Sequence, residues 1–160
     1  QFYADVEGHP KDAGLARACG AGRQAIDAAG GDTLHVGRAE NFIVGRPDLD
    51  DTIARLKAYD AAGADCLYAP AIRTREQIEA VVAAVAPKPF NLLIGWSSEL
   101  TLQDVAALGV RRISVGGALA RAAWGGFDRA ARALAGEGRF DFEGAASGAE
   151  LNQFFKPFAA

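Results

Sequence analysis

The sequence contains no methionine and has only two cysteines and two histidines among its 160 residues. Cys19 and Cys66 lie far apart and form no spacing typical of a zinc site, which favours the reduced thiols of a cytoplasmic protein. No apolar run approaches the ~20 residues that a membrane span needs. Residues 1–6 lack the basic and long apolar regions of a signal peptide. We therefore expect a cytoplasmic protein. The missing initiator methionine leaves open that the natural N-terminus lies upstream of Gln1.

The sequence also lacks a large excess of positive or negative charge. The net charge is −3, so the composition gives no indication of a nucleic-acid or membrane partner. Half of the residues are hydrophobic and 23% are charged, as in ordinary globular proteins. A chain of this length suffices for one domain with a sizeable core. We expect a single domain over residues 1–160, in which residues 136–160 form a C-terminal tail.

Strand and helix patterns alternate along the chain with short connections. The periodicity predicts strands at 33–36, 65–69, 90–94 and 110–115. It predicts helices at 11–29, 52–62, from a capping box at Thr74–Gln77, from Thr101 to about Gly109, and at 118–134. Asp50 or Asp51 is the expected cap of the helix at 52–62.

Four strand–helix units in strict alternation indicate an α/β fold with parallel strands and right-handed crossovers. Two architectures fit this pattern: a doubly wound sheet and part of a (β/α)8 barrel. A complete barrel needs roughly 200 or more residues, so this chain cannot close one by itself.

Two motifs, in this order, are more specific. Residues 37–53 begin Gly-Arg-Ala-Glu-Asn-Phe, and residues 108–123 contain Ile-Ser-Val-Gly-Gly-Ala-Leu-Ala-Arg. Together with residues 61–70 and 150–155, they resemble the isocitrate lyase/phosphoenolpyruvate mutase superfamily, in particular its small bacterial lyase/mutase-like and oxaloacetate-decarboxylase-like branch. The resemblance implies a TIM-type (β/α)8 barrel. This chain would supply its C-terminal half, from the end of strand four through strand eight.

The resemblance also implies an activity. Family members act on small 2-oxo acids and break or make C–C or P–C bonds next to an enolate, with the help of Mg²⁺. It therefore implies a magnesium-dependent lyase or mutase, for example an oxaloacetate decarboxylase. The alternative is a truncated or degenerate family member without activity that serves as a binding or assembly module.

Arg38 matches the arginine that the family places at the end of strand five, where barrel active sites lie. Its guanidinium suits a substrate carboxylate. The alternative is an ion pair with Glu40 that only holds the loop. Glu40 is a candidate for positioning Arg38 or binding metal-bound water, and Asn41 is a candidate substrate ligand. Gly116 and Gly117 precede a helix, and a helix N-terminus favours an anion, so they are candidate substrate ligands. The alternative is that these glycines only allow close packing of the strand and the helix.

Asp5 and Glu7 are the candidate metal ligands, because residues 4–8 resemble the metal-binding end of the family's strand four. Ala4 stands where the family has a Glu, so Asp5 or Glu7 would have to substitute for it. The family's Asp-x-Asp metal pair has no equivalent here. Either that pair precedes Gln1 in the natural protein, or the chain is degenerate.

Assembly is a further implication of the resemblance, because the family's eighth helix is often exchanged between subunits. Residues 118–134 correspond to that helix. The exposed edges of a partial parallel sheet also favour association. We therefore expect a homo-oligomer, either a dimer or a tetramer. Of the two histidines, His35 lies in a strand pattern and is interpreted as a barrel residue, and His9 carries no motif.

Overall fold

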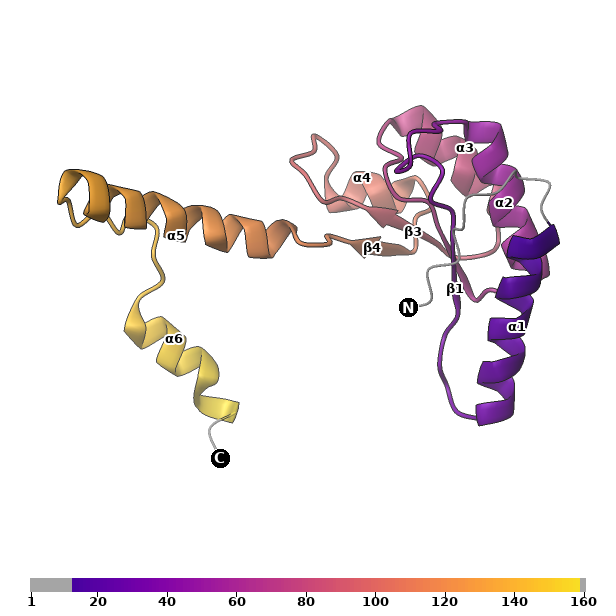
Figure 1. The fold of residues 1–160 in the computed structure, drawn as a ribbon, viewed down its shortest axis with the longest axis horizontal. Coiled ribbons are helices and arrows are strands. Elements are labelled where there is room, and N and C mark those ends of the chain that lie inside the picture. The colour runs from indigo at the N-terminus through magenta and orange to yellow at the C-terminus, as the bar shows by residue number, and fades with distance from the viewer. Residues whose placement is uncertain (1–12, 159–160) are drawn as a thin grey trace. The chain divides into compact units, whose positions relative to one another are not determined.

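The computed structural model describes residues 13–158. They form two compact units, of which the first ends at Gly116 and the second begins at Gly117. The first unit alternates helices and strands (Figure 1): α1 (Ala13–Ala29), β1 (Val36–Arg38), α2 (Leu49–Ala61), β2 (Cys66–Tyr68), α3 (Arg75–Val85), β3 (Phe90–Leu93), α4 (Leu102–Ala107) and β4 (Arg112–Ser114). The second unit contains α5 (Ala118–Glu137), α6 (Gly148–Phe155) and the short 3₁₀ helix η1 (Lys156–Phe158).

The four strands form one parallel sheet in the order β1-β2-β3-β4. Each strand therefore pairs with the next one in the chain, and the sheet winds in a single direction. A doubly wound sheet reverses its strand order at a switch point, whereas a (β/α) barrel does not. The prediction of parallel strands is confirmed, and the strand order selects the barrel-type alternative.

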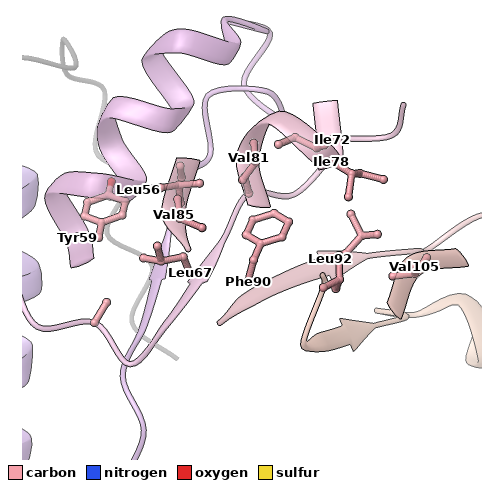
Figure 2. Close-up of a cluster of buried hydrophobic side chains, with 14 of the residues drawn as sticks. Leu56, Tyr59, Leu67, Ile72, Ile78, Val81, Val85, Phe90, Leu92 and Val105 are labelled. Atoms are coloured by element: carbon pink, nitrogen blue, oxygen red, sulfur yellow. The ribbon is translucent and has the colours of Figure 1, made fainter. Parts of the chain in front are cut away.

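The core of the first unit lies between the sheet and helices α2, α3 and α4 (Figure 2). The largest fully buried apolar side chains are Leu56, Tyr59, Leu67, Ile72, Ile78, Val81, Phe90, Leu92 and Val105. Burying a side chain of this size contributes about 1.5–3 kcal/mol. Because successive strand residues point to opposite faces, packing of Leu67, Phe90 and Leu92 against the helices directs Tyr68 and Asn91 to the other face of the sheet.

The first strand begins later than its sequence pattern suggests. The pattern predicts residues 33–36, but β1 runs from Val36 to Arg38 because pairing with β2 starts at Val36 and Cys66. The carbonyl of His35 accepts hydrogen bonds from the backbone N–H groups of Asp65 and Cys66, just before the ladder. Arg38 is consequently the last residue of β1.

Two capping predictions have different outcomes. The capping box of Thr74 and Gln77 is confirmed at the start of α3. The expected cap at Asp50 or Asp51 is wrong: α2 begins at Leu49, and Asp48 is its N-cap. The backbone of Asp48 is extended, as a capping residue requires, and its carboxylate accepts from the N–H of Asp51 at 2.9 Å. Asp50 and Asp51 instead lie in the first turn, where the helix dipole favours acidic residues.

The second unit is more helical than its sequence pattern suggests. Helix α5 continues beyond Leu134 to Glu137 and ends at Gly138, whose φ of 65° is the left-handed conformation that glycine favours. Helix α6 lies in the predicted C-terminal tail and starts with a capping box formed by Ser147 and Glu150. Within residues 13–158, no helix is both long and apolar enough to span a membrane.

Candidate functional site

Arg38 lies at the carboxyl end of β1, on the face of the sheet opposite the helices. The neighbouring residue Gly37 faces α2 so closely that a Cβ there would lie 2.7 Å from the Cβ of Tyr59. Because strand residues alternate, Arg38 points the other way. The carboxyl ends of the strands carry the active site in TIM-type barrels. The local packing therefore directs this arginine toward the region where a barrel binds its substrate.

The guanidinium of Arg38 is held on two sides. It forms an ion pair with the carboxylate of Glu40, and it lies 4.8 Å from the centre of the Tyr68 ring on the adjacent strand. The side chains of Arg38 and Glu40 are only 17% and 11% exposed. A guanidinium stacked on a ring and paired on one side has its orientation restricted. The arrangement is compatible with both predicted roles, carboxylate binding and loop support.

Asn41 holds the loop that follows β1. Its side-chain amide donates to the carbonyl of Asp48 at 3.0 Å and to the hydroxyl of Thr52, and the residue is 2% exposed. The N–H of Arg46 also donates to the carbonyl of Asn41 at 2.8 Å. These bonds fix the loop against the start of α2. The structure thus shows a structural use for Asn41, and its binding of substrate stays a prediction.

A second arginine–aromatic pair lies among the loops that follow the strands. The guanidinium of Arg73, in the loop after β2, lies 4.2 Å from the centre of the Trp96 ring, in the loop after β3. Tyr68, Arg73 and Trp96 are not among the site residues predicted from the sequence. Their positions near the carboxyl ends of predicted strands could have indicated that they belong to the site.

The predicted anion site at Gly116 and Gly117 lies at the boundary of the two units. Gly116 ends the first unit with a φ of 52°, a conformation that glycine favours. Gly117 is the N-cap of α5 and makes no side-chain cap hydrogen bond. Anion binding by these glycines stays a prediction.

Asp5 and Glu7, the predicted metal ligands, lie outside the described residues. Mg²⁺ requires several oxygen ligands in near-octahedral geometry. Within residues 13–158, no three His, Cys, Asp or Glu side chains are grouped so that they could hold a metal ion. The described part of the chain therefore offers no cluster of three such ligands for Mg²⁺.

A polar cluster lies at the opposite end of β1 from Arg38. The ring Nε2 of His35 lies 3.2 Å from Sγ of Cys19, and the backbone N–H of His35 donates to Asp65 at 2.7 Å. Asp65 also accepts from Arg23 at 2.7 Å. Burial raises the pKa of the Cys19 thiol. These contacts tie α1 to the start of the sheet and give His35 a structural role there.

Comparison with known proteins identifies the family. The sequence model of phosphoenolpyruvate phosphomutase matches residues 10–135. An oxaloacetate decarboxylase from Rhodopseudomonas palustris (strain BisB18) is 38% identical over 128 residues, which are 78% of this chain and 43% of that protein. The matched segment thus covers less than half of the length of the curated relatives.

Solved structures agree with this assignment. A protein from Burkholderia cenocepacia J2315, provisionally assigned as a lyase/mutase, superposes with a TM-score of 0.82 at 46% identity, over 88% of this chain and 51% of that one. Oxaloacetate acetylhydrolase, solved with the inhibitor 3,3-difluorooxalacetate, superposes with a TM-score of 0.75 over 95% of this chain and 51% of its own. At 21% identity, it supports the fold alone. The chain therefore belongs to the phosphoenolpyruvate phosphomutase family of the isocitrate lyase/phosphoenolpyruvate mutase superfamily, and it corresponds to the C-terminal half of the TIM-type barrel.

Proposed function

We propose that this chain forms the C-terminal half of the active site of a lyase or mutase that acts on a small 2-oxo acid, with oxaloacetate as the first substrate to test. The observation that carries the proposal is the placement of Arg38 at the carboxyl end of β1, where Tyr68 and Glu40 orient its guanidinium. The similarity to oxaloacetate decarboxylases supports the choice of oxaloacetate.

Arg38 binds the carboxylate next to the 2-oxo group in this proposal. In oxaloacetate decarboxylation the C3–C4 bond breaks, CO₂ leaves, and the electron pair of that bond forms the enolate of pyruvate. The enolate then takes a proton on C3. A fixed guanidinium orients the 2-oxo acid and stabilises the negative charge that develops on the former oxo oxygen. Glu40 acts as a positioning residue, because its carboxylate restrains Arg38.

We also propose a dependence on Mg²⁺, which is carried over from the family. The metal would stabilise the enolate, and because residues 13–158 group no three metal-ligating side chains, Asp5 or Glu7 would help to hold it. A cytoplasmic location likewise stays a proposal.

Exposed aromatic residues of the second unit support assembly into a homo-oligomer. Trp124 and Phe127 on α5 are 67% and 63% exposed and contact each other edge to face, with ring centres 5.4 Å apart. Phe154 and Phe155 on α6 form a similar exposed pair. Exposed aromatic pairs of this kind typically lie in protein interfaces. This observation favours the alternative role as an assembly module as well.

The activity is tested by pyruvate release from oxaloacetate, with and without Mg²⁺. Metals promote the loss of CO₂ without enzyme, so only the excess over a protein-free control counts. We expect Arg38→Ala to remove at least nine-tenths of that excess and Arg38→Lys to recover little of it, because an ammonium lacks the planar donor pair. Arg17→Ala, at an exposed position on α1, is the matched control.

Two results would contradict the proposal. One is an excess rate that Arg38→Ala leaves unchanged. The other is a folded wild-type chain without any excess, which would favour the inactive assembly module. Light scattering over a range of protein concentrations then tests assembly, and a monomer at every concentration would exclude it.

A further inference from the structure

Arg73 and Trp96 form a charged element that the proposed reaction does not yet use. Arg73 lies five residues after Tyr68, the end of β2, and Trp96 lies three residues after Leu93, the end of β3. The guanidinium lies 4.2 Å from the centre of the indole ring. The contact therefore joins two of the loops that, in a barrel, surround the substrate.

Both ends of Arg73 are restrained. Its backbone N–H donates to the side chain of Gln77 at 3.1 Å, next to the capping box of α3. Its guanidinium stacks on Trp96. A stacked guanidinium still presents its N–H groups at the edge of its plane, where a carboxylate binds with two parallel hydrogen bonds.

Within residues 13–158, the charge of Arg73 is not neutralised by a neighbouring acid. Among the described residues, no carboxylate forms an ion pair with Arg73, whereas Arg75, two positions later, pairs with Glu79 at 3.9 Å. Arg73 is also exposed at the surface. An accessible cation without an acidic partner is available to an anionic ligand.

The sheet places the two arginine–aromatic pairs along one edge. Arg38 ends β1, and the parallel strands β2 and β3 follow in order, so their carboxyl ends lie on the same side. Arg73 follows β2, the strand next to β1, and neighbouring strands are about 4.8 Å apart. Two long arginine side chains that start near the carboxyl ends of neighbouring strands can approach the two carboxylates of a short diacid.

We propose that Arg73, held by Trp96, binds the second carboxylate of a C4 dicarboxylate whose first carboxylate is bound by Arg38. This inference rests on the proposed function and adds the substrate class, diacids in preference to monoacids. It also accounts for product release, because pyruvate has one carboxylate and cannot use both arginines.

The proposal predicts that replacing Arg73 changes KM and kcat differently. The second carboxylate of oxaloacetate is the one that leaves as CO₂ and loses its charge. An interaction with it is stronger in the bound substrate than in the transition state, so it improves binding without accelerating the chemical step. Arg73→Gln should therefore raise KM for oxaloacetate at least fivefold and leave kcat equal or higher.

Binding is measured without turnover. Trp124→Phe makes Trp96 the single tryptophan of the 160-residue chain, because the sequence contains two. In this background, succinate should change the fluorescence of Trp96 and bind more tightly than propionate. Arg73→Gln should weaken the binding of succinate at least fivefold and the binding of propionate less than twofold. Arg73→Lys should have an intermediate effect on succinate binding. Arg75→Gln removes the same charge two residues away and should behave as the parent.

Several results would overturn the inference: no succinate binding by the parent chain, an equal loss for both acids, or an Arg75→Gln effect as large as that of Arg73→Gln. Circular dichroism of each variant verifies that the fold is retained. The two proposals fail separately. Selective succinate binding without Arg38-dependent pyruvate release contradicts only the reaction, whereas Arg38-dependent release with an unchanged KM in Arg73→Gln contradicts only the diacid site.

Discussion

The guanidinium of Arg38 lies over the ring of Tyr68, its register partner on the neighbouring strand, at 4.8 Å from the ring centre. The pairing of β1 with β2 thus brings the cation and the ring together. Tyr68 is 5% exposed, so the ring is a fixed surface rather than a mobile side chain. The orientation of Arg38 depends on a residue 30 positions away in the sequence.

We expect Tyr68→Leu to weaken succinate binding about fivefold, because a cation–π contact at a partly buried site contributes about 1 kcal/mol. Tyr68→Phe keeps the ring and should stay within twofold of the wild type. The measurement is the Trp96 fluorescence titration in the Trp124→Phe background. Equal losses in both variants would show that the hydroxyl, and not the ring, supports Arg38.

We expect Gly37→Ala to destabilise the fold by about 1–3 kcal/mol, because its Cβ would lie 2.7 Å from the Cβ of Tyr59. Gly20→Ala, within α1, is the matched control: its Cβ would meet only the carbonyl of Ala62 at 3.8 Å, an ordinary contact. The control should stabilise by about 0.5–1 kcal/mol through higher helix propensity. Urea unfolding measures both, and a neutral Gly37→Ala would mean that the β1–α2 contact is looser than described.

We expect Asn41→Ala to lower the free energy of unfolding by about 1–3 kcal/mol, because the buried carbonyl of Asp48 and the hydroxyl of Thr52 lose the donor amide. Gln103→Ala, at an exposed position of α4, should change it by less than about 0.5 kcal/mol. Urea unfolding followed by circular dichroism compares the two. If Asn41→Ala leaves stability unchanged but weakens succinate binding, Asn41 is a substrate ligand instead.

We expect both cysteines to be unreactive in the folded protein. Burial raises the pKa of the Cys19 thiol, and it raises the pKa of Cys66 despite the opposing charge of Arg112. At pH 8 a disulfide reagent should therefore modify them at least tenfold more slowly in the folded chain than in urea. Rapid native modification of either thiol would contradict this burial.

The same shifts make stability depend on pH. The unfolded thiols ionise near their ordinary pKa of 9.0, and the folded thiols ionise only at higher pH. In the interval between these values the unfolded chain binds fewer protons, so the free energy of unfolding falls as the pH rises. The double variant Cys19→Ala/Cys66→Ala should show a shallower decline above pH 9. An identical decline would assign it to other groups.

Local patterns in the sequence determined most of the helices. The capping box at Thr74 involves only residues within four positions, so it can be recognised from the sequence. The cap of α2 was misplaced because Asp48, Asp50 and Asp51 are equivalent by type. Only the backbone conformation of Asp48 distinguishes it. Helix α6 was missed because it has only eight residues, too few for its apolar positions to establish a helical period.

The sequence by itself determined the alternation of strands and helices, the family resemblance and the choice of Arg38, because these depend on local patterns and residue types. The tertiary structure decided what surrounds Arg38. Strand pairing places Tyr68 beneath it, and the contact between two loops joins Arg73 to Trp96. These contacts link residues 23 to 30 positions apart, and no local spacing predicts them, because register and loop paths are set by the packing of the whole sheet against its helices.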